Sequence, residues 1–228
     1  MSDVKKAALF GEKNPLTLLA DLWRWVFERH RIESTRIEEA VPMLPPAPIQ
    51  ATFGTRALQL DGEGALYQRR YAVSMTGVGL SPPALIRSVG LNFAALSPSA
   101  LADFEKTKGV PWQLKVGDEF DITMLGPWNG AVRVVDVGEN SFTFATLVGH
   151  PEAGTIQFCA LQPQAGQIEF EIRSSARSRD TIVDIAYQNG GHEVQLAAWA
   201  SFLEAVIKMA GGIQQGEIRS LIQVVGRD

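Results

Sequence analysis

Residues 141–177 decide the fold, and they read SFTFATLVGHPEAGTIQFCALQPQAGQIEFEIRSSAR. Successive side chains of an extended strand point to opposite faces, so positions two apart share a face. Three parts of this stretch place aromatic and aliphatic side chains on one shared face: Phe142, Phe144, Thr146, Val148 and His150, then Ile156, Phe158 and Ala160, then Ile168, Phe170 and Ile172. The pattern predicts three half-buried antiparallel strands whose aromatic-rich face needs a cover.

The composition is that of an ordinary globular protein. Of 228 residues, 46% are hydrophobic and 20% are charged, which supports a sizeable core. The net charge of -4 gives no electrostatic reason to expect a nucleic-acid partner. The single cysteine, Cys159, cannot form an intramolecular disulfide and fits a reducing compartment. No apolar run is long enough for a signal peptide or a membrane span, so we expect a cytoplasmic protein of bacterial type.

The first 48 residues predict an appendage. Asn14 and Pro15 are typical of a helix start, and large apolar residues then recur at helical spacing up to about Arg31. Four prolines between Val41 and Pro48 predict an extended linker. We therefore expect an N-terminal helix and linker over residues 1–48, a main domain over 49–213 and a C-terminal tail over 214–228, and the tail is compatible with either a helix or a strand.

Strands and helices follow one another through the main domain. The Ser-Pro pairs at Ser81-Pro82 and Ser97-Pro98 predict two short helices, and Gly211-Gly212 predicts the end of a long one. Before and between them the expected elements are strands at 52–60, 66–75, 119–124 and 131–137, and helices at 180–187 and 193–210. The order predicts an α+β helix-grip fold, in which a curved antiparallel sheet wraps around a long C-terminal helix and leaves a cavity between them.

Two segments carry a resemblance to a known family. They are Gly126–Asp136 (GPWNGAVRVVD) and Phe144–Gly154 (FATLVGHPEAG), and they resemble the domain-of-unknown-function family nineteen-ninety of bacteria and plants. The family's hallmark is similar to Thr-Leu-x-Gly-His-Pro-Glu-x-Gly, which corresponds here to Thr146–Gly154 and is followed by Phe158 and by a turn around Arg177. The resemblance covers about residues 66–212. It implies the START and polyketide-cyclase (SRPBCC) fold and no established activity.

His150 is the sharpest candidate for chemistry. Strand parity places it on the Phe142 face at a strand end, hence at the rim of the expected cavity. A histidine there can donate a hydrogen bond to a ligand carbonyl or act as an acid or base. Two structural alternatives stay open: His150 supports its own Gly-His-Pro turn, and Glu152 forms a salt bridge with His150 or with an arginine.

Other residues are predicted to line the cavity together with His150. Arginines at the start of a helix can hold an anionic group, and this makes Arg177 a candidate. The aromatic candidates face the cavity by strand parity, by position at a turn tip or by position on the apolar stripe of the last helix: Phe142, Phe144, Phe158, Phe170, Trp128 and Trp199. Packing in the core is the alternative role for each of these aromatic residues.

Several chemistries lack their sequence signals. The histidines are scattered without ligand spacing, so no metal site is expected. The sequence contains no Gly-x-Ser-x-Gly elbow, P-loop or dinucleotide fingerprint, and Cys159 points away from the His150 face by parity. We therefore assign no catalytic residue, metal or cofactor from the sequence.

Three functions remain, and the volume of the cavity separates them. The first is a non-catalytic protein that binds an apolar small molecule, such as a lipid or a polyketide-like compound. The second is a cyclase- or hydrolase-like enzyme that uses His150 with Glu152 or an arginine. The third is an interaction module whose cavity is filled by its own side chains. An empty apolar cavity favours the first, converging polar groups favour the second, and a filled cavity favours the third.

Overall fold

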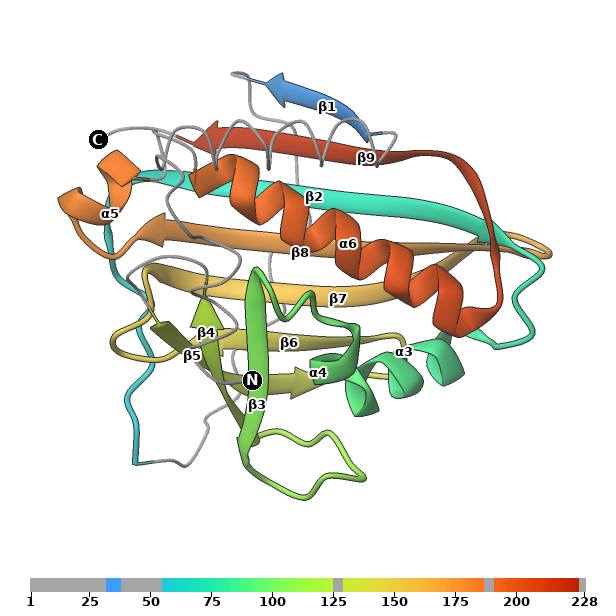
Figure 1. Cartoon of the computed structure of the whole chain (residues 1–228), viewed down its shortest axis with the longest axis horizontal. Coiled ribbons are helices and arrows are strands. Elements are labelled where there is room, and N and C mark those ends of the chain that lie inside the picture. Colours follow the sequence, from blue (N-terminus) through green and yellow to red (C-terminus); the bar gives the residue numbers. More distant parts are fainter. Residues whose placement is uncertain (1–31, 38–54, 125–128, 187–190, 226–228) are drawn as a thin grey trace.

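A nine-stranded sheet dominates the computed structural model, which describes residues 32–37, 55–124, 129–186 and 191–225 (Figure 1). In chain order the elements are β1 (Ile32–Ile37), β2 (Glu63–Thr76), α3 (Pro82–Leu91), α4 (Phe93–Leu96), β3 (Ala102–Lys108), β4 (Glu119–Met124), β5 (Asn129–Val137), β6 (Ser141–Thr146), β7 (Glu152–Gln164), β8 (Gln167–Ser178), α5 (Thr181–Ala186), α6 (His192–Ala210) and β9 (Ile213–Val225). The protein is of the α+β class, as predicted. No helix in the described ranges is long and apolar enough to cross a membrane.

The strands lie in the order β1-β9-β2-β8-β7-β6-β5-β4-β3. β1 runs parallel to β9, and the other neighbouring strands run antiparallel, so the sheet is mixed rather than purely antiparallel. The register sets Tyr71 opposite Ile172 and Ile172 opposite Phe158. Buried side chains of β2, β8 and β7 therefore form continuous rows across the middle of one face.

Helix α6 lies across β2, β8 and β7 and covers that face (Figure 1). Its apolar stripe is buried, as the 3.6-residue spacing predicts. The helix ends where Gly211 adopts a left-handed conformation with φ of 65°, and the Gly212 N–H donates to the Ile207 carbonyl at 3.1 Å. Glycine adopts this conformation without the steric cost of a side chain, which explains the stop at Gly211-Gly212.

The long helix is not the last element of the chain. The segment after it is β9, which pairs with β2 from Thr76 opposite Ile213 to Leu66 opposite Val225. β9 in turn pairs with β1. The boundaries that we expected at residues 48 and 213 therefore do not follow the edges of the sheet, because strands from both flanking segments join it.

Phenylalanine rings fill the centre between the sheet and the helices. Phe93 of α4 is 1% exposed and lies at the middle of the group. Its ring centroid is 5.0 Å from those of Phe104, Phe144 and Phe158, 5.1 Å from that of Phe202 and 6.0 Å from those of Phe120 and Phe142. The space that we expected to be a cavity along this face is closed at its centre.

Two expected elements are wrong. Ser97-Pro98 does not start a helix, because the Ser97 hydroxyl donates to the Phe93 carbonyl at 2.9 Å and so ends α4. The residues after it form β3, where Phe104 pairs with Ile122 of β4 and is buried. The strand expected at 52–60 is reduced to an isolated bridge between Leu58 and Leu147 in its described part. Residues 52–54 lie outside the described ranges.

A charged cluster lies on the other face of the sheet, around Glu171 of β8. Glu171 is fully buried, and its two carboxylate oxygens accept hydrogen bonds from Arg70 Nε at 3.0 Å and Arg173 Nε at 2.6 Å. Burial raises the pKa of Glu171, but the hydrogen bonds and charges around it outweigh burial and lower the pKa to about 2. The carboxylate is therefore charged at neutral pH and is held by two arginines.

We expect Glu171 to make stability sensitive to acid. Its pKa in the folded state lies below the value of about 4.3 in an unfolded chain, so its contribution is complete above that pH and is lost as the pH falls toward 2. Glu171→Gln should be less stable than the wild type at pH 7, and the difference in free energy of unfolding should shrink below about pH 4.5. Urea unfolding at a series of pH values measures that difference. A difference that stays constant down to pH 2 would contradict this role of Glu171.

Candidate functional site

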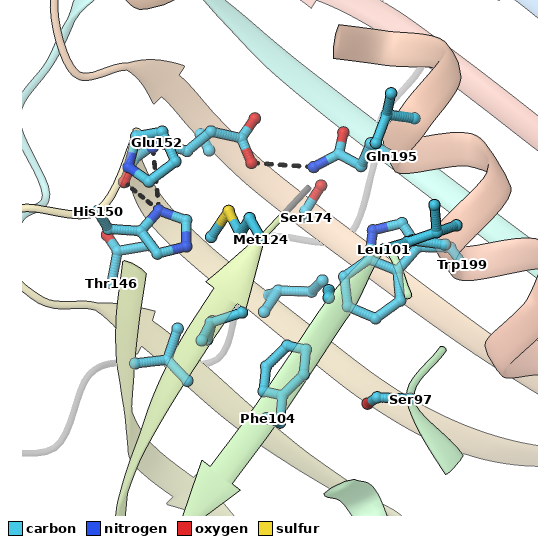
Figure 2. A pocket seen from close by; sticks show the side chains of 18 of the residues that line it. Ser97, Leu101, Phe104, Met124, Thr146, His150, Glu152, Ser174, Gln195 and Trp199 are labelled. Atoms are coloured by element: carbon cyan, nitrogen blue, oxygen red, sulfur yellow. Dashed lines mark hydrogen bonds between the residues drawn. The ribbon is translucent and has the colours of Figure 1, made fainter. Parts of the chain in front are cut away.

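A pocket of about 190 Å³ lies between the N-terminal half of α6 and the strands β3, β4, β7 and β8 (Figure 2). Apolar side chains form most of its wall, among them Leu101, Phe104, Ile122, Met124, Ile156 and Trp199. Polar side chains also reach it: Thr146, His150, Glu152, Thr155, Ser174 and Gln195. The pocket thus has a mainly apolar wall with a set of polar groups around Glu152.

Glu152 joins the sheet to helix α6 at the polar part of the wall. Its Oε1 accepts a hydrogen bond from Arg69 Nη1 at 2.8 Å, and its Oε2 accepts one from Gln195 Nε2 at 2.9 Å. Arg69 comes from β2 and is 1% exposed, while Glu152 is 8% exposed. A buried carboxylate needs such partners, because removing a charge from water is costly unless it is paired.

His150 lies against the backbone of Glu152. Its Nδ1 is 3.0 Å from the Glu152 nitrogen and 2.9 Å from the Glu152 carbonyl oxygen. One tautomer accepts from the N–H and the other donates to the carbonyl, so either ring nitrogen can carry the proton. Burial lowers the pKa of His150; the charge and backbone of Glu152 oppose this effect and Arg179 adds to it. His150 is therefore neutral at neutral pH.

The turn that carries His150 is held by hydrogen bonds at several points. The Gln59 side chain accepts from the Gly149 N–H at 2.9 Å and donates to the His150 carbonyl at 3.1 Å. The Thr146 hydroxyl accepts from the Gly154 N–H at 2.9 Å. Gly149 has a φ of 101°, which only glycine adopts readily. This left-handed residue leaves Val148 exposed and His150 buried, so strand parity fails at Val148 although it places His150 correctly.

Gly130 of β5 makes room for His150. A Cβ added at Gly130 would lie 2.4 Å from His150 Cδ2 and 2.7 Å from Met124 Cε, both far closer than van der Waals contact. The Asn129-Gly130 pair predicted a tight hairpin turn from sequence. The structure gives Gly130 a second role, which is to let the imidazole pack against the strand.

Gly130→Ala is expected to lower the free energy of unfolding by roughly 1–3 kcal/mol, the usual cost of overpacking, and to displace His150. Urea unfolding gives the loss, and the imidazole signals in a nitrogen-15 NMR spectrum report the displacement. Gly79→Ala is the matched control, since a Cβ at Gly79 meets nothing within 4 Å. Equal behaviour of the two variants would show that His150 has room to move.

Three buried polar atoms in the pocket wall have no hydrogen-bond partner. They are the hydroxyl of Ser174, the side-chain oxygen Oε1 of Gln195 and the indole Nε1 of Trp199. Native structures satisfy the great majority of buried polar atoms, so each exception asks for an explanation. Here the three exceptions share one pocket.

The structure brings only some of the predicted site residues together. His150 and Trp199 line the pocket. Phe142, Phe144, Phe158 and Phe170 lie in the packed core and not in the lining, because α4 and α6 cover them. Arg177 lies beyond the pocket, and its Nη1 donates to the Gly64 carbonyl at 2.6 Å. Trp128 lies outside the described residues.

Cys159 has the inert character that its parity suggested. It is 5% exposed, and its Sγ lies 3.9 Å from Glu171 Oε2 on the outer face of the sheet. Burial raises the pKa of the thiol to about 11, with smaller effects from the surrounding charges. A thiol is a nucleophile only as the thiolate, so Cys159 is not a nucleophile at neutral pH. The described residues also contain no group of three or more His, Cys, Asp or Glu that is placed to hold a metal ion.

Sequence reasoning missed three polar residues of the site. Arg69, Ser174 and Gln195 each occupy a position where the neighbouring positions on the same face are apolar. Arg69, for example, shares its face of β2 with Tyr71 and Val73. A polar residue in an otherwise apolar row is the signal that was available.

Residues 98–203 match the family model of the domain of unknown function DUF1990. The resemblance to this family is thereby confirmed, and the matched segment runs from the residue before β3 into α6. Among curated proteins no sequence matches the chain.

Solved structures with a similar arrangement include two from small-molecule biosynthesis that match over most of their length. Norcoclaurine synthase from Thalictrum flavum is 11% identical over 68% of this chain and 96% of its own, with a TM-score of 0.48. The Zhui aromatase/cyclase from Streptomyces sp. R1128 is 11% identical over 65% of this chain and 99% of its own, with a TM-score of 0.47. The di-domain aromatase/cyclase StfQ of the steffimycin pathway is 11% identical over 64% of this chain and 51% of its own, with a TM-score of 0.48.

Proposed function

We propose that the protein binds a small, uncharged and largely apolar molecule in the pocket beside Glu152 and Trp199. The observation that carries this proposal is the pocket of about 190 Å³ itself, which a core otherwise filled with aromatic side chains leaves open. Protein interiors are close-packed and hold few voids larger than a water molecule. An apolar space of this size therefore points to an occupant.

The volume limits the size of that occupant. An engineered apolar cavity of about 150 Å³ takes up benzene, whereas sites for drug-sized ligands measure about 300–1,000 Å³. At about 190 Å³ this pocket suits one ring or a chain of similar bulk. The proposal is thus narrower than the lipid or polyketide-like ligand predicted from the sequence, because the phenylalanine cluster closes the rest of the face.

The charges in the wall favour an uncharged ligand. Arg69 and Glu152 neutralise each other at 2.8 Å, and His150 is neutral. A charged ligand would bring a charge into a buried site that has no free counter-charge among the described lining residues, and burial of an unpaired charge is costly.

Calorimetric titration with toluene tests the proposal. We expect saturable binding, a rise in the thermal midpoint with toluene concentration, and backbone NMR shifts centred on the lining residues. Ala198→Phe should abolish binding, because Ala198 lines the pocket and the added ring occupies it. Ala165→Phe is the control, since Ala165 is exposed in the turn after β7. Absence of binding near the solubility limit of toluene, or shifts confined to other surfaces, would overturn the proposal.

The enzymatic alternative has one observation in its favour and one against it. His150 is neutral and lines the pocket, as a general acid or base must. The carboxylate of Glu152, however, is engaged by Arg69 and Gln195, so it does not orient the imidazole as expected from the sequence. Binding without turnover is therefore the better-supported function.

A further inference from the structure

We infer that the molecule bound in this pocket carries a hydroxyl group, and that Ser174, Gln195 and Trp199 recognise it. This inference rests on the proposed function and names its ligand class, a neutral monocyclic alcohol or phenol. The recognising atoms are the three buried polar atoms of the wall that have no partner (Figure 2).

Ser174 is the most buried of the three. It is 7% exposed, and it sits in the middle of the sheet, opposite Arg69 on one side and Ile156 on the other. Its hydroxyl can donate or accept. Because its neighbours in the strand are pinned by pairing, the hydroxyl keeps a fixed position in the pocket wall.

Gln195 presents an acceptor whose identity its own hydrogen bond establishes. The amide NH₂ donates to the Glu152 carboxylate at 2.9 Å, since a carboxylate can only accept. The other end of the amide is therefore the oxygen Oε1, and it has no partner among the described residues. The Arg69 pair fixes Glu152, and Glu152 in turn fixes the orientation of Gln195.

Trp199 presents a donor on a ring held by aromatic contacts. Its ring centroid lies 5.7 Å from that of Phe158 and 5.9 Å from that of Phe202, both in edge-on arrangements. The indole Nε1–H can only donate, and it too is buried without a partner. The wall thus offers one acceptor, one donor and one hydroxyl that does either.

A hydroxyl group is the small neutral group that meets this set. It donates to the Gln195 oxygen and accepts from the Trp199 N–H or from Ser174. A ketone or aldehyde only accepts, so Gln195 Oε1 would stay unsatisfied. An ammonium group is charged and would face Arg69 without a counter-charge of its own. A hydrocarbon would leave all three atoms unsatisfied.

Phenol and toluene form the test, because they have the same shape and differ in hydroxyl versus methyl. Toluene is the more hydrophobic, so the hydrophobic effect alone favours toluene. We expect wild-type protein to bind phenol roughly tenfold to a hundredfold more tightly than toluene, the range that follows from leaving buried polar atoms unpaired. Calorimetry gives both dissociation constants, and benzaldehyde, the carbonyl probe, should fall between them.

Variants assign the preference to its atoms. Ser174→Ala and Trp199→Phe should each reduce the phenol-to-toluene ratio severalfold while toluene affinity changes little. Ser220→Ala is the matched control, because Ser220 is another buried strand serine whose hydroxyl has no partner, and it lies outside the lining. It should leave the ratio unchanged.

The outcomes separate this inference from the proposed function. Binding of toluene with no preference for phenol would overturn the hydroxyl assignment and leave the proposed function standing. Absence of binding by both probes would overturn the proposed function and this inference with it. A phenol preference that Ser174→Ala and Trp199→Phe leave intact would also overturn the assignment, because other atoms would then recognise the hydroxyl.

Discussion

Replacing Glu152 with alanine is expected to lower the free energy of unfolding by about 3–5 kcal/mol, the usual cost of breaking a buried ion pair on one side. The variant leaves the guanidinium of Arg69, which is 1% exposed, without its carboxylate. It also removes the acceptor of Gln195 and so frees the pocket side of α6. Urea unfolding of the wild type and the variant at pH 7 measures the loss.

A double variant tests whether the unpaired charge causes the loss. Arg69→Met combined with Glu152→Leu should recover most of the stability, since replacing both partners by apolar residues of similar volume is often neutral or stabilising. Arg69→Met alone should be about as harmful as Glu152→Ala. If Glu152→Ala costs less than about 1 kcal/mol, then water reaches Arg69 and the pair is not buried in solution.

This ion pair shows where sequence reasoning stopped. The sequence suggested a salt bridge from Glu152 to His150 or to an arginine, and it left the arginine unidentified. Arg69 and Glu152 are 83 residues apart and meet through β2, β8 and β7. Alternation of side chains identifies the strands, but the register between strands depends on the whole sheet and cannot be read from any one strand.

Local chemistry predicted the elements that depend on local chemistry. Pro82 at the first turn of α3 and Gly211 at the end of α6 are where the structure has these boundaries. Alternation along Gln167–Ser178 correctly predicted β8. The Ser97-Pro98 pair misled, because the same residue types end one helix as readily as they begin another. The decisive fact there is the pairing of β3 with β4, which is tertiary.

The site was predictable in part for the same reason. His150 stood out as a polar residue after an aromatic strand, and Trp199 stood out on the stripe of α6, and both line the pocket. Phe142, Phe144, Phe158 and Phe170 were expected there too, since their face is the correct one. Whether a face is hollow or filled depends on what packs against it. In this protein the filling comes from Phe93, a residue in a four-residue helix with no pattern of its own.

Phe93→Ala is expected to lower the free energy of unfolding by about 3–5 kcal/mol, the range for removing a buried aromatic side chain from a packed core. Phe93 is 1% exposed and touches rings from β3, β4, β6, β7 and α6, so several elements lose contacts at once. Urea unfolding measures the loss. Phe93→Leu keeps most of the volume and is the matched control, with an expected loss below about 1.5 kcal/mol.

The same variant should also change what the protein binds. Phe93 and Phe104 have ring centroids 5.0 Å apart, and Phe104 lines the pocket, so removing the Phe93 ring extends the pocket toward the centre of the sheet. We expect Phe93→Ala to bind naphthalene, a two-ring probe too large for a pocket of about 190 Å³, while the wild type and Phe93→Leu do not. Calorimetric titration distinguishes the three proteins. Naphthalene binding to the wild type would show that the centre is open without any substitution, and its absence from a folded Phe93→Ala would show that the core collapses into the space.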